Sequence, residues 1–389
     1  MALTRRSASS RAVQSTMSSA PDRSAETSDA PPIVVCVGVT RWKRRAVGRL
    51  IAGQDASLPL FAHDAASAVR IARARSGAIG VWTSRAPTDL ASRAATAGVP
   101  LARIEDGFIR SSGLGAQCHP PASIVLDRRG AHFDPGQASD LEILLAHGDF
   151  DTALLERAQR LADQIVALGV TKYNLPGTSV SVPKGRRTVL VAGQVEDDLS
   201  VRLGGAGVAG NLDLLRRART LEPDAVILYR PHPDVEAGHR QGFAPDEAVL
   251  RHADQVVRRQ ALPSLLAAVD AVHVLTSLTG FEALLRGREV VTHGQPFYAG
   301  WGLTRDLVPL PRRDRRLSLL ELVAGALILY PRYIDPGSGA PCTPEALVAC
   351  LGRHGPPRPG LLPTVRRWQG AARRRLGLRP PALGRAVTP

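Results

Sequence analysis

Short apolar runs alternate with amphipathic segments along the first half of the chain. The run IVVCVGV over residues 33–39 is rich in β-branched residues and follows two prolines, which is typical of a buried strand in a parallel sheet. The same spacing predicts further strands at 60–61, 78–82 and 101–104, and helices at 44–52, 65–76, 89–97 and 139–168. Strands that alternate with helices in this way predict βαβ units and a parallel sheet.

A second series of the same kind follows a segment rich in Gly, Pro and Ser at 169–187. Its strands are predicted at 187–194, 225–231, 271–277 and 289–294, and its helices at 211–220, 262–269 and 280–285. Two such series predict an α/β chain with two Rossmann-like domains that face each other across a cleft. The helices predicted at 318–329 and 343–350 are expected to cross back to the first domain.

These boundaries divide the chain into five parts. Residues 1–30 are predicted to be a disordered lead-in, 31–170 the N-terminal Rossmann-like domain and 185–310 the C-terminal one. Helices are expected over 311–352, and a basic, disordered tail over 353–389. Within that tail, the string TVRRWQGAARRRLGL could instead form a short basic amphipathic helix that adheres to an anionic membrane surface.

The net charge of +15 is concentrated in the tail. Residues 353–389 contain nine arginines and no acidic residue, whereas 31–352 carry a net charge of only +5. A body of that charge lacks the basic face that binding to a phosphate backbone requires, so nucleic acid is not an expected partner. No apolar run reaches the ~18 residues that cross a bilayer. Because a signal-peptide core is also missing, we expect a cytoplasmic protein that is soluble or at most peripheral on a membrane.

The four cysteines lie far apart and form no C-x-x-C pair. Neither a metal site nor a disulfide is therefore predicted.

An acid pair, Glu105-Asp106, directly follows the predicted strand at 101–104. The ligand crevice of an open α/β sheet lies at the carboxyl ends of its strands, and Gly107 lets the backbone turn there. One acid could act as a nucleophile or base while the other forms hydrogen bonds. Acids at strand ends also serve as helix caps or lie in solvent, so the pair by itself does not establish catalysis.

The motif RPHP at 230–233 follows a predicted strand of the second half. Pro233 and the proline before His232 restrict the backbone of that histidine. His232 could then donate a hydrogen bond to a phosphate oxygen, with Arg230 adding positive charge. The alternative is a rigid loop with an ordinary exposed histidine.

A third motif, TSLTG at 276–280, lies at a predicted junction between a strand and a helix. The hydroxyls of Ser277 and Thr279, with the backbone N–H groups up to Gly280, form the kind of helix start that binds anions. The alternative is a plain helix cap, and a capped helix start can still bind an anion.

The loop PFYAGWGLT at 296–304 places aromatic residues among glycines directly after a strand. Tyr298 and Trp301 could stack on a base or a sugar, or they could pack in the domain interface. The two interpretations stay open at this point, with packing favoured for Trp301.

The three polar motifs together predict a GT-B-like glycosyltransferase. The nucleotide would bind to the second domain, and the reacting carbon would face the acid pair of the first. No Walker A sequence occurs, which argues against P-loop enzymes.

Longer strings resemble the KpsC-type capsule polysaccharide β-Kdo transferases. They are RIEDGFIRSSGLGA, PPASIVLDRRG, KYNLPG, GQVEDDLSVRLGG, YRPHPDVEAGHR, LTSLTGFEALLRGREVVTHGQPFYAGWGLTRD and YPRYIDPGSGAPCTPEAL. They extend from residue 103 to 347 in matching order. The resemblance therefore covers most of the chain between the lead-in and the tail.

The resemblance implies a retaining glycosyltransferase that moves the sugar acid β-Kdo from CMP-β-Kdo to a lipid-linked glycan acceptor in capsule linker synthesis. It implies that Asp106 is the catalytic acidic residue, with Glu105 as acid/base support, and that His232 and Ser277 bind the donor phosphate. Gln194 and Glu196 in GQVEDDLSVRLGG are further candidate contacts. No cofactor or metal is expected, and the partners are the donor, the acceptor, the capsule assembly machinery and the anionic inner-membrane surface.

The chain departs from the family pattern in one respect, because characterised members often carry two transferase modules and this chain has room for one. The linkage and the acceptor are therefore not predicted. Two other functions stay open, namely a non-catalytic partner in capsule assembly or export, and a transferase for another CMP-nonulosonic acid.

Overall fold

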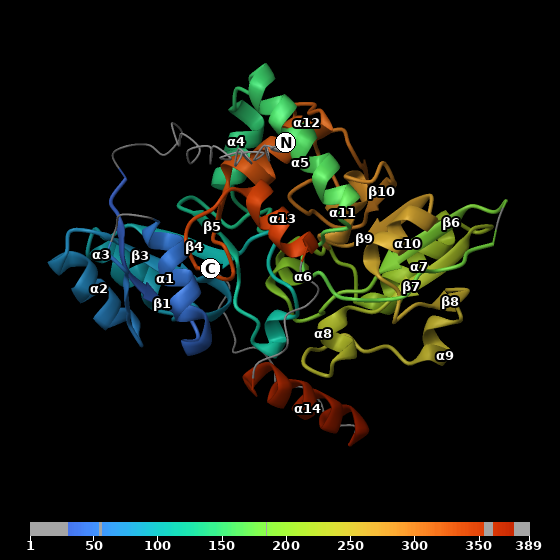
Figure 1. Cartoon of the computed structure of the whole chain (residues 1–389), viewed down its shortest axis with the longest axis horizontal. Coiled ribbons are helices and arrows are strands. Elements are labelled where there is room, and N and C mark those ends of the chain that lie inside the picture. Colours follow the sequence, from blue (N-terminus) through green and yellow to red (C-terminus); the bar gives the residue numbers. More distant parts are fainter. Residues whose placement is uncertain (1–29, 54–56, 184, 354–360, 377–389) are drawn as a thin grey trace, which may run out of the picture.

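Two six-stranded sheets, one in each half of the chain, organise the computed structural model (Figure 1). The structure describes residues 30–53, 57–183, 185–353 and 361–376. We call the part built on the first sheet the N-lobe and the part built on the second the C-lobe. The predicted disordered lead-in, residues 1–30, lies outside the described residues except for its last one.

The N-lobe sheet has the strand order β12-β5-β4-β3-β1-β2. Its strands are β1 (Ile33–Val37), β2 (Leu60–Phe61), β3 (Ala78–Trp82), β4 (Leu101–Asp106), β5 (Ser123–Asp127) and β12 (Pro331–Tyr333). The four strands from β1 to β4 are parallel, whereas β5 runs antiparallel to β4. The last strand, β12, comes from the far end of the chain and pairs antiparallel with β5.

The C-lobe sheet is parallel throughout and has the order β11-β10-β9-β6-β7-β8. Its strands are β6 (Thr188–Ala192), β7 (Val226–Arg230), β8 (Gln255–Val256), β9 (Ala271–Val274), β10 (Glu289–Thr292) and β11 (Arg305–Asp306). The central strand β6 is buried at all five positions, as expected for a parallel sheet covered on both faces.

Helices connect the strands of both lobes. In the N-lobe they are α1 (Arg44–Ala52), α2 (Ala65–Ala74), α3 (Leu90–Thr96), α4 (Asp140–His147), α5 (Thr152–Ala167) and the short 3₁₀ turns η1 (Arg41–Lys43), η2 (Thr83–Arg85) and η3 (Gly115–Gln117). In the C-lobe they are α6 (Leu199–Gly204), α7 (Asn211–Leu221), α8 (Pro233–Glu236), α9 (Asp246–Val249), α10 (Leu262–Ala268) and α11 (Thr279–Leu284). The later elements are α12 (Leu319–Val323), the π-helical turn η4 (Ala324–Leu329), α13 (Pro344–Arg353) and α14 (Leu361–Arg375).

Most predicted strands and helices are confirmed, and two predictions in the N-lobe were wrong in detail. The acid pair was expected in a loop, but both acids belong to β4, because Glu105 pairs with Val125 and Asp106 with Ile124 of the unpredicted strand β5. The single helix expected at 139–168 is divided into α4 and α5. Gly148 ends α4, and the side chain of Asp151 caps a new helix start.

The segment after the C-lobe crosses back to the N-lobe, as predicted. Helices α12 and α13 pack against α5, and η4 packs against α4 and α5. The expectation of helices alone over 311–352 was wrong, because β12 extends the N-lobe sheet. A continuous apolar core follows this crossover, and its rings include Phe108 of the N-lobe stacked on Phe297 of the C-lobe at 4.4 Å.

Of the two interpretations of the basic tail, disorder and a short helix, the structure shows a helix for residues 361–375, which form α14. Residues 354–360 and 377–389 of the tail lie outside the described residues. The helix lies below the boundary of the two lobes (Figure 1). It contacts η3 of the N-lobe, and its Gly370 packs against Ala237 and His239 of the C-lobe. No described helix is both long and apolar enough to cross a membrane.

Candidate active site

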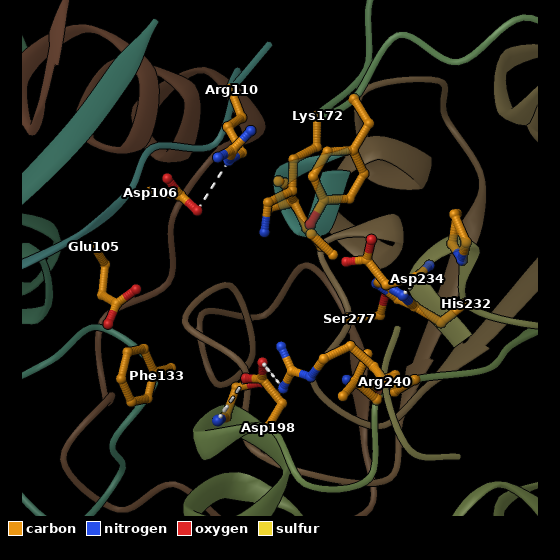
Figure 2. Close-up of a pocket in the computed structure, with 18 of the residues that line it drawn as sticks. Glu105, Asp106, Arg110, Phe133, Lys172, Asp198, His232, Asp234, Arg240 and Ser277 are labelled. Atoms are coloured by element: carbon orange, nitrogen blue, oxygen red, sulfur yellow. Dashed lines mark hydrogen bonds and ion pairs between the residues drawn. The ribbon is translucent and has the colours of Figure 1, made fainter. Parts of the chain in front are cut away.

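A cavity of about 600 Å³ lies between the two lobes and is lined by residues of both. The ends of β4, β6, β7 and β9 meet at this cavity, because the carboxyl ends of the strands in both sheets point toward the boundary. Of the residues singled out in the sequence, eight line it: Glu105, Asp106, Gln194, Arg230, His232, Pro233, Ser277 and Thr279. Figure 2 shows the acid pair on one side of the cavity and His232, Asp234 and Ser277 on the other.

Asp106 is held between two cations. Its Oδ2 lies 2.9 Å from Nε of Arg110, and Nζ of Lys43 lies 3.2 Å from each carboxylate oxygen (Figure 2 shows the contact with Arg110). Burial by itself would raise the pKa of Asp106, but Arg110 and Lys43 outweigh it and hold this pKa well below its usual range. The carboxylate is therefore ionised at any physiological pH.

Both cations are fixed by the fold. The Arg110 side chain is fully buried, and its Nη1 donates to the carbonyl of His119 at 3.0 Å and to Oγ of Ser111 at 2.7 Å. The Lys43 ammonium lies 3.6 Å from the centre of the Trp82 ring, a cation–π contact. Burial lowers the pKa of Lys43 to about 8, although Asp106 acts to raise it.

Glu105 has the opposite electrostatic setting. Its Oε1 is buried and finds no hydrogen-bond partner among the described residues. Burial, and next the charge of Asp106, raises the pKa of Glu105 to about 8, with Lys43 opposing. Near neutral pH the acid pair therefore carries one permanent negative charge and one exchangeable proton, the division of roles that acid/base catalysis requires.

His232 is oriented by its own backbone. It is the N-cap of α8, and its Nδ1 accepts a hydrogen bond from the backbone N–H of Asp234 at 3.1 Å. Burial, and next the charge of Lys172, lowers the pKa of His232 to about 3. The ring is therefore neutral at physiological pH, and because Nδ1 accepts, the proton lies on Nε2, which is left to donate.

The TSLTG motif and Gln194 form a connected polar layer beside His232. Oγ of Ser277 accepts from the backbone N–H of Thr279 at 3.2 Å, and the hydroxyls of these two residues are 3.2 Å apart. Nε2 of Gln194 donates to the hydroxyl of Thr276 at 2.8 Å, and Oε1 of Gln194 accepts from the backbone N–H of Thr276 at 2.7 Å. Nη1 of Arg230 is buried without a partner among the described residues.

Four candidates lie outside the cavity lining. Glu196 accepts from the backbone N–H of Asn211 at 2.8 Å at the start of α7. Tyr298 and Trp301 are fully buried, and their polar atoms donate to the carbonyls of Ser277 and Phe297, respectively. Gly280 packs against the Tyr298 ring, where a Cβ would lie 2.3 Å from the phenol oxygen. Of the two interpretations left open for Tyr298 and Trp301, the structure shows packing, because their loop folds into the core.

Cations that the sequence did not single out also line the cavity. Besides Lys43 and Arg110, they are Arg85, Lys172, Arg240 and Arg366. Burial acts to lower the pKa of Lys172, but Tyr173, Asp106 and Asp198 together raise it, so the ammonium stays charged. The KYNLPG string contains Lys172, whose carbonyl accepts from the backbone N–H groups of Arg110 and Ser111 at 3.1 and 3.2 Å. The interdomain segment is therefore part of the site.

Asp234 is a further buried acid on the C-lobe side. It is 6% exposed, and its Oδ1 has no partner among the described residues. Burial raises the pKa of Asp234 to about 6, against the opposing charge of Arg240. In the part of the chain that the structure describes, no three His, Cys, Asp or Glu side chains are grouped so as to hold a metal ion.

Residues 77–178 and 174–333 match a protein family described as capsule polysaccharide biosynthesis protein. Capsule polysaccharide modification protein LipA from Neisseria meningitidis serogroup A is 43% identical over 321 residues, which make up 82% of this chain and 45% of LipA. The chain thus spans about half the length of this relative.

Two solved chains of Thermosulfurimonas dismutans KpsC are similar in structure, each over 82% of this chain and 98% of its own length. The one described as a β-Kdo 2,7 transferase has 34% sequence identity and a TM-score of 0.67. The one described as a β-Kdo 2,4 transferase has 32% identity and a TM-score of 0.71. The similarity covers both lobes and agrees with the predicted GT-B-like fold.

Proposed function

The chain belongs to the family of capsule polysaccharide biosynthesis proteins, and on that basis we propose that it is a retaining glycosyltransferase that moves β-Kdo from CMP-β-Kdo to a lipid-linked glycan acceptor. The observation that carries the proposal is the shared cavity. An ionised carboxylate from one lobe faces a set of hydrogen-bond donors from the other across a space of about 600 Å³.

The C-lobe side of the cavity suits the phosphate of a cytidylyl donor. Nε2 of His232 donates without adding charge, and the hydroxyl of Thr279 adds a second donor. Arg230 supplies positive charge, and its Nη1, which is buried without a hydrogen-bond partner among the described residues, can donate to a phosphate oxygen. These groups stabilise the charge that develops on CMP as it leaves.

The N-lobe side suits the anomeric carbon of the sugar. In the first step, an oxygen of Asp106 bonds to that carbon while the carbon–oxygen bond to CMP breaks and CMP departs with the electron pair. CMP is a good leaving group at neutral pH, so this step needs no proton. Lys43 and Arg110 keep Asp106 ionised and fixed, so that it approaches from one face only. If no bond forms, the same carboxylate stabilises the oxocarbenium ion.

Glu105 supplies the base for the second step. An acceptor hydroxyl attacks the anomeric carbon, its proton passes to Glu105, and the bond to Asp106 breaks. A pKa of about 8 leaves part of the Glu105 population ionised near neutral pH, and such a group is an efficient general base. Two inversions restore the anomeric configuration of the donor.

A panel of CMP-sugars with a Kdo-bearing lipid mimic tests the proposal. We expect transfer from CMP-Kdo and little from CMP-sialic acid or related donors, with retained configuration in the product. Analysis of the product linkage distinguishes a 2,4 from a 2,7 bond. Transfer from another CMP-nonulosonic acid in preference to CMP-Kdo would mean that the donor is that sugar nucleotide and not CMP-Kdo. Absence of transfer from every donor, with CMP bound, would instead indicate a non-catalytic capsule assembly protein.

A further inference from the structure

Helix α14 joins both lobes at the edge of the cavity and lies beyond the residues that match the family. Its buried side packs closely, because a Cβ on Gly370 would lie 2.1 Å from the carbonyl oxygen of Ala237. From the same side Arg366 reaches the cavity lining. The inner side of this helix is therefore formed by a glycine and a cation.

The apolar residues of α14 point the other way. Val365, Trp368 and Leu376 at the helix end are 43%, 77% and 70% exposed. At 100° per residue these three positions fall within one arc of the helix surface, together with the exposed Ala372. A helix that packs on a protein normally buries such a stripe. Here the stripe faces solvent, and a contiguous exposed apolar surface is typical of an interaction site.

The charge around the stripe identifies that partner. Residues 353–389 contain nine arginines and no acidic residue. A tryptophan and a leucine on one side of a helix that is rich in arginine are the composition of helices that lie in the headgroup region of an anionic bilayer. A second copy of the chain fits poorly, because two apposed stripes would bring two such arginine-rich segments together.

We propose that α14 docks the protein on an anionic lipid surface, with Val365, Trp368 and Leu376 inserted among the lipids. At 15 residues the helix is roughly 22 Å long, so it lies in the interface rather than crossing it. Since the inner side of α14 borders the cavity, docking holds the cavity mouth next to the bilayer. The proposed lipid-linked acceptor gives this placement a use, but docking itself needs no sugar donor.

Vesicle sedimentation of the full chain tests this inference. The lipids are phosphatidylcholine alone and an equal mixture of phosphatidylcholine and phosphatidylglycerol. The wild type is expected to sediment with the anionic vesicles only, and Trp368→Ser/Leu376→Ser to bind them at least tenfold more weakly. The matched control is Val166→Ser/Leu329→Ser, which removes two apolar residues that are 41% and 39% exposed. They belong to α5, which lies far from α14 in Figure 1, and to η4, which packs on α5. This control is expected to bind like the wild type.

Circular dichroism establishes that both variants are folded, and transfer to a soluble acceptor is expected to be unchanged in both. The inference is overturned if the wild type ignores anionic vesicles, or if the Trp368/Leu376 variant binds them as well as the control. A dimer that this variant converts to a monomer, without vesicle binding, would assign the stripe to self-association instead. Vesicle binding by a protein that transfers no sugar would leave docking intact and refute only the proposed function.

Discussion

The N-lobe and C-lobe walls of the cavity differ in the charge that they present to a ligand. The N-lobe wall holds Asp106 as a permanent charge, with Lys43 and Arg110 within 3.2 Å of its carboxylate. The C-lobe wall beside it combines the cations Arg230 and Arg240 with neutral donors, of which His232 is the clearest because burial keeps its ring uncharged. One wall fixes a charge, and the other offers hydrogen bonds.

This difference matches the two tasks of a transfer reaction. A carboxylate that meets a developing cation must stay ionised and in place, which two buried cations achieve at the cost of desolvation. A leaving phosphate gains charge only during the reaction, so preorganised donors such as His232 stabilise it without reorganisation. Substitutions in the two walls should therefore affect different steps.

The largest effect is expected from Asp106→Asn. Loss of the carboxylate should reduce transfer by about a thousandfold or more, whereas CMP affinity should change by less than about threefold. Transfer assays and titration calorimetry with CMP measure the two quantities. Because Lys43 and Arg110 lose their counter-charge, thermal melting must establish that the variant is folded. A variant that transfers at the wild-type rate would remove Asp106 from the reaction.

Glu105→Gln should separate the two steps of the reaction, because both acids of the N-lobe wall act in it but Glu105 acts only in the second step. Without the base, transfer to the acceptor should fall by roughly a hundredfold, since general bases contribute about 10²–10⁴. Release of CMP from CMP-Kdo in a single turnover without acceptor should continue. Rapid-quench measurement of CMP release distinguishes the steps. Equal losses in both would mean that Glu105 acts before CMP leaves.

The C-lobe wall is probed by His232→Ala. Loss of a hydrogen bond to a charged oxygen should weaken CMP binding by roughly 10–100-fold. Calorimetry with CMP measures the change, and His147→Ala, at the end of α4 outside the cavity lining, is the matched control. Unchanged affinity in His232→Ala would place the phosphate elsewhere.

The raised pKa of Glu105 also predicts a dependence of stability on pH. An exposed glutamate ionises near 4.5, whereas in the folded protein the pKa of Glu105 is about 8. Between these values the unfolded chain loses the proton and the folded chain keeps it, so the contribution of Glu105 to stability falls as pH rises from 4.5 to 8. Glu105→Gln removes this pH-dependent loss of stability, because glutamine does not ionise. Thermal melting should show the variant stabilised by a few degrees at pH 8 and little changed at pH 4.5.

The smallest effect on transfer is expected from Glu196→Ala. The Glu196 carboxylate caps the start of α7 and lies outside the cavity lining. Transfer should stay within about twofold of wild type, while the free energy of unfolding falls by ~1 kcal/mol. Chemical denaturation and the transfer assay check both. A large loss of transfer with intact stability would mean that Glu196 takes part in the transfer reaction.

The sequence predicted the parts of the site that depend on local pattern. Buried strands such as β6 are continuous apolar runs, and the polar residues at strand ends, among them Asp106 and His232, could be located from those runs. Contacts distant in sequence could not be found in this way. Lys43 lies 63 residues from Asp106 and belongs to a stretch that resembles any basic helix start.

Two further discrepancies have the same physical origin. An aromatic loop rich in glycine has the same composition whether it binds a ligand or fills a core, so Tyr298 could not be assigned until its burial was known. The direction of a strand also depends on its neighbours. The antiparallel strand β5 was not predicted. The pairing with β5 that places the acid pair in β4 was therefore not predicted either.

The central claim is that Asp106 is the group that meets the anomeric carbon, and intact-protein mass spectrometry tests it most directly. The chain is mixed with CMP-Kdo in the absence of acceptor, quenched, weighed and then mapped by peptide. The account predicts a mass increase of one Kdo residue on the peptide that contains Asp106, and no increase in Asp106→Asn. An adduct on a different residue, or the same adduct in the Asp106→Asn variant, would contradict it.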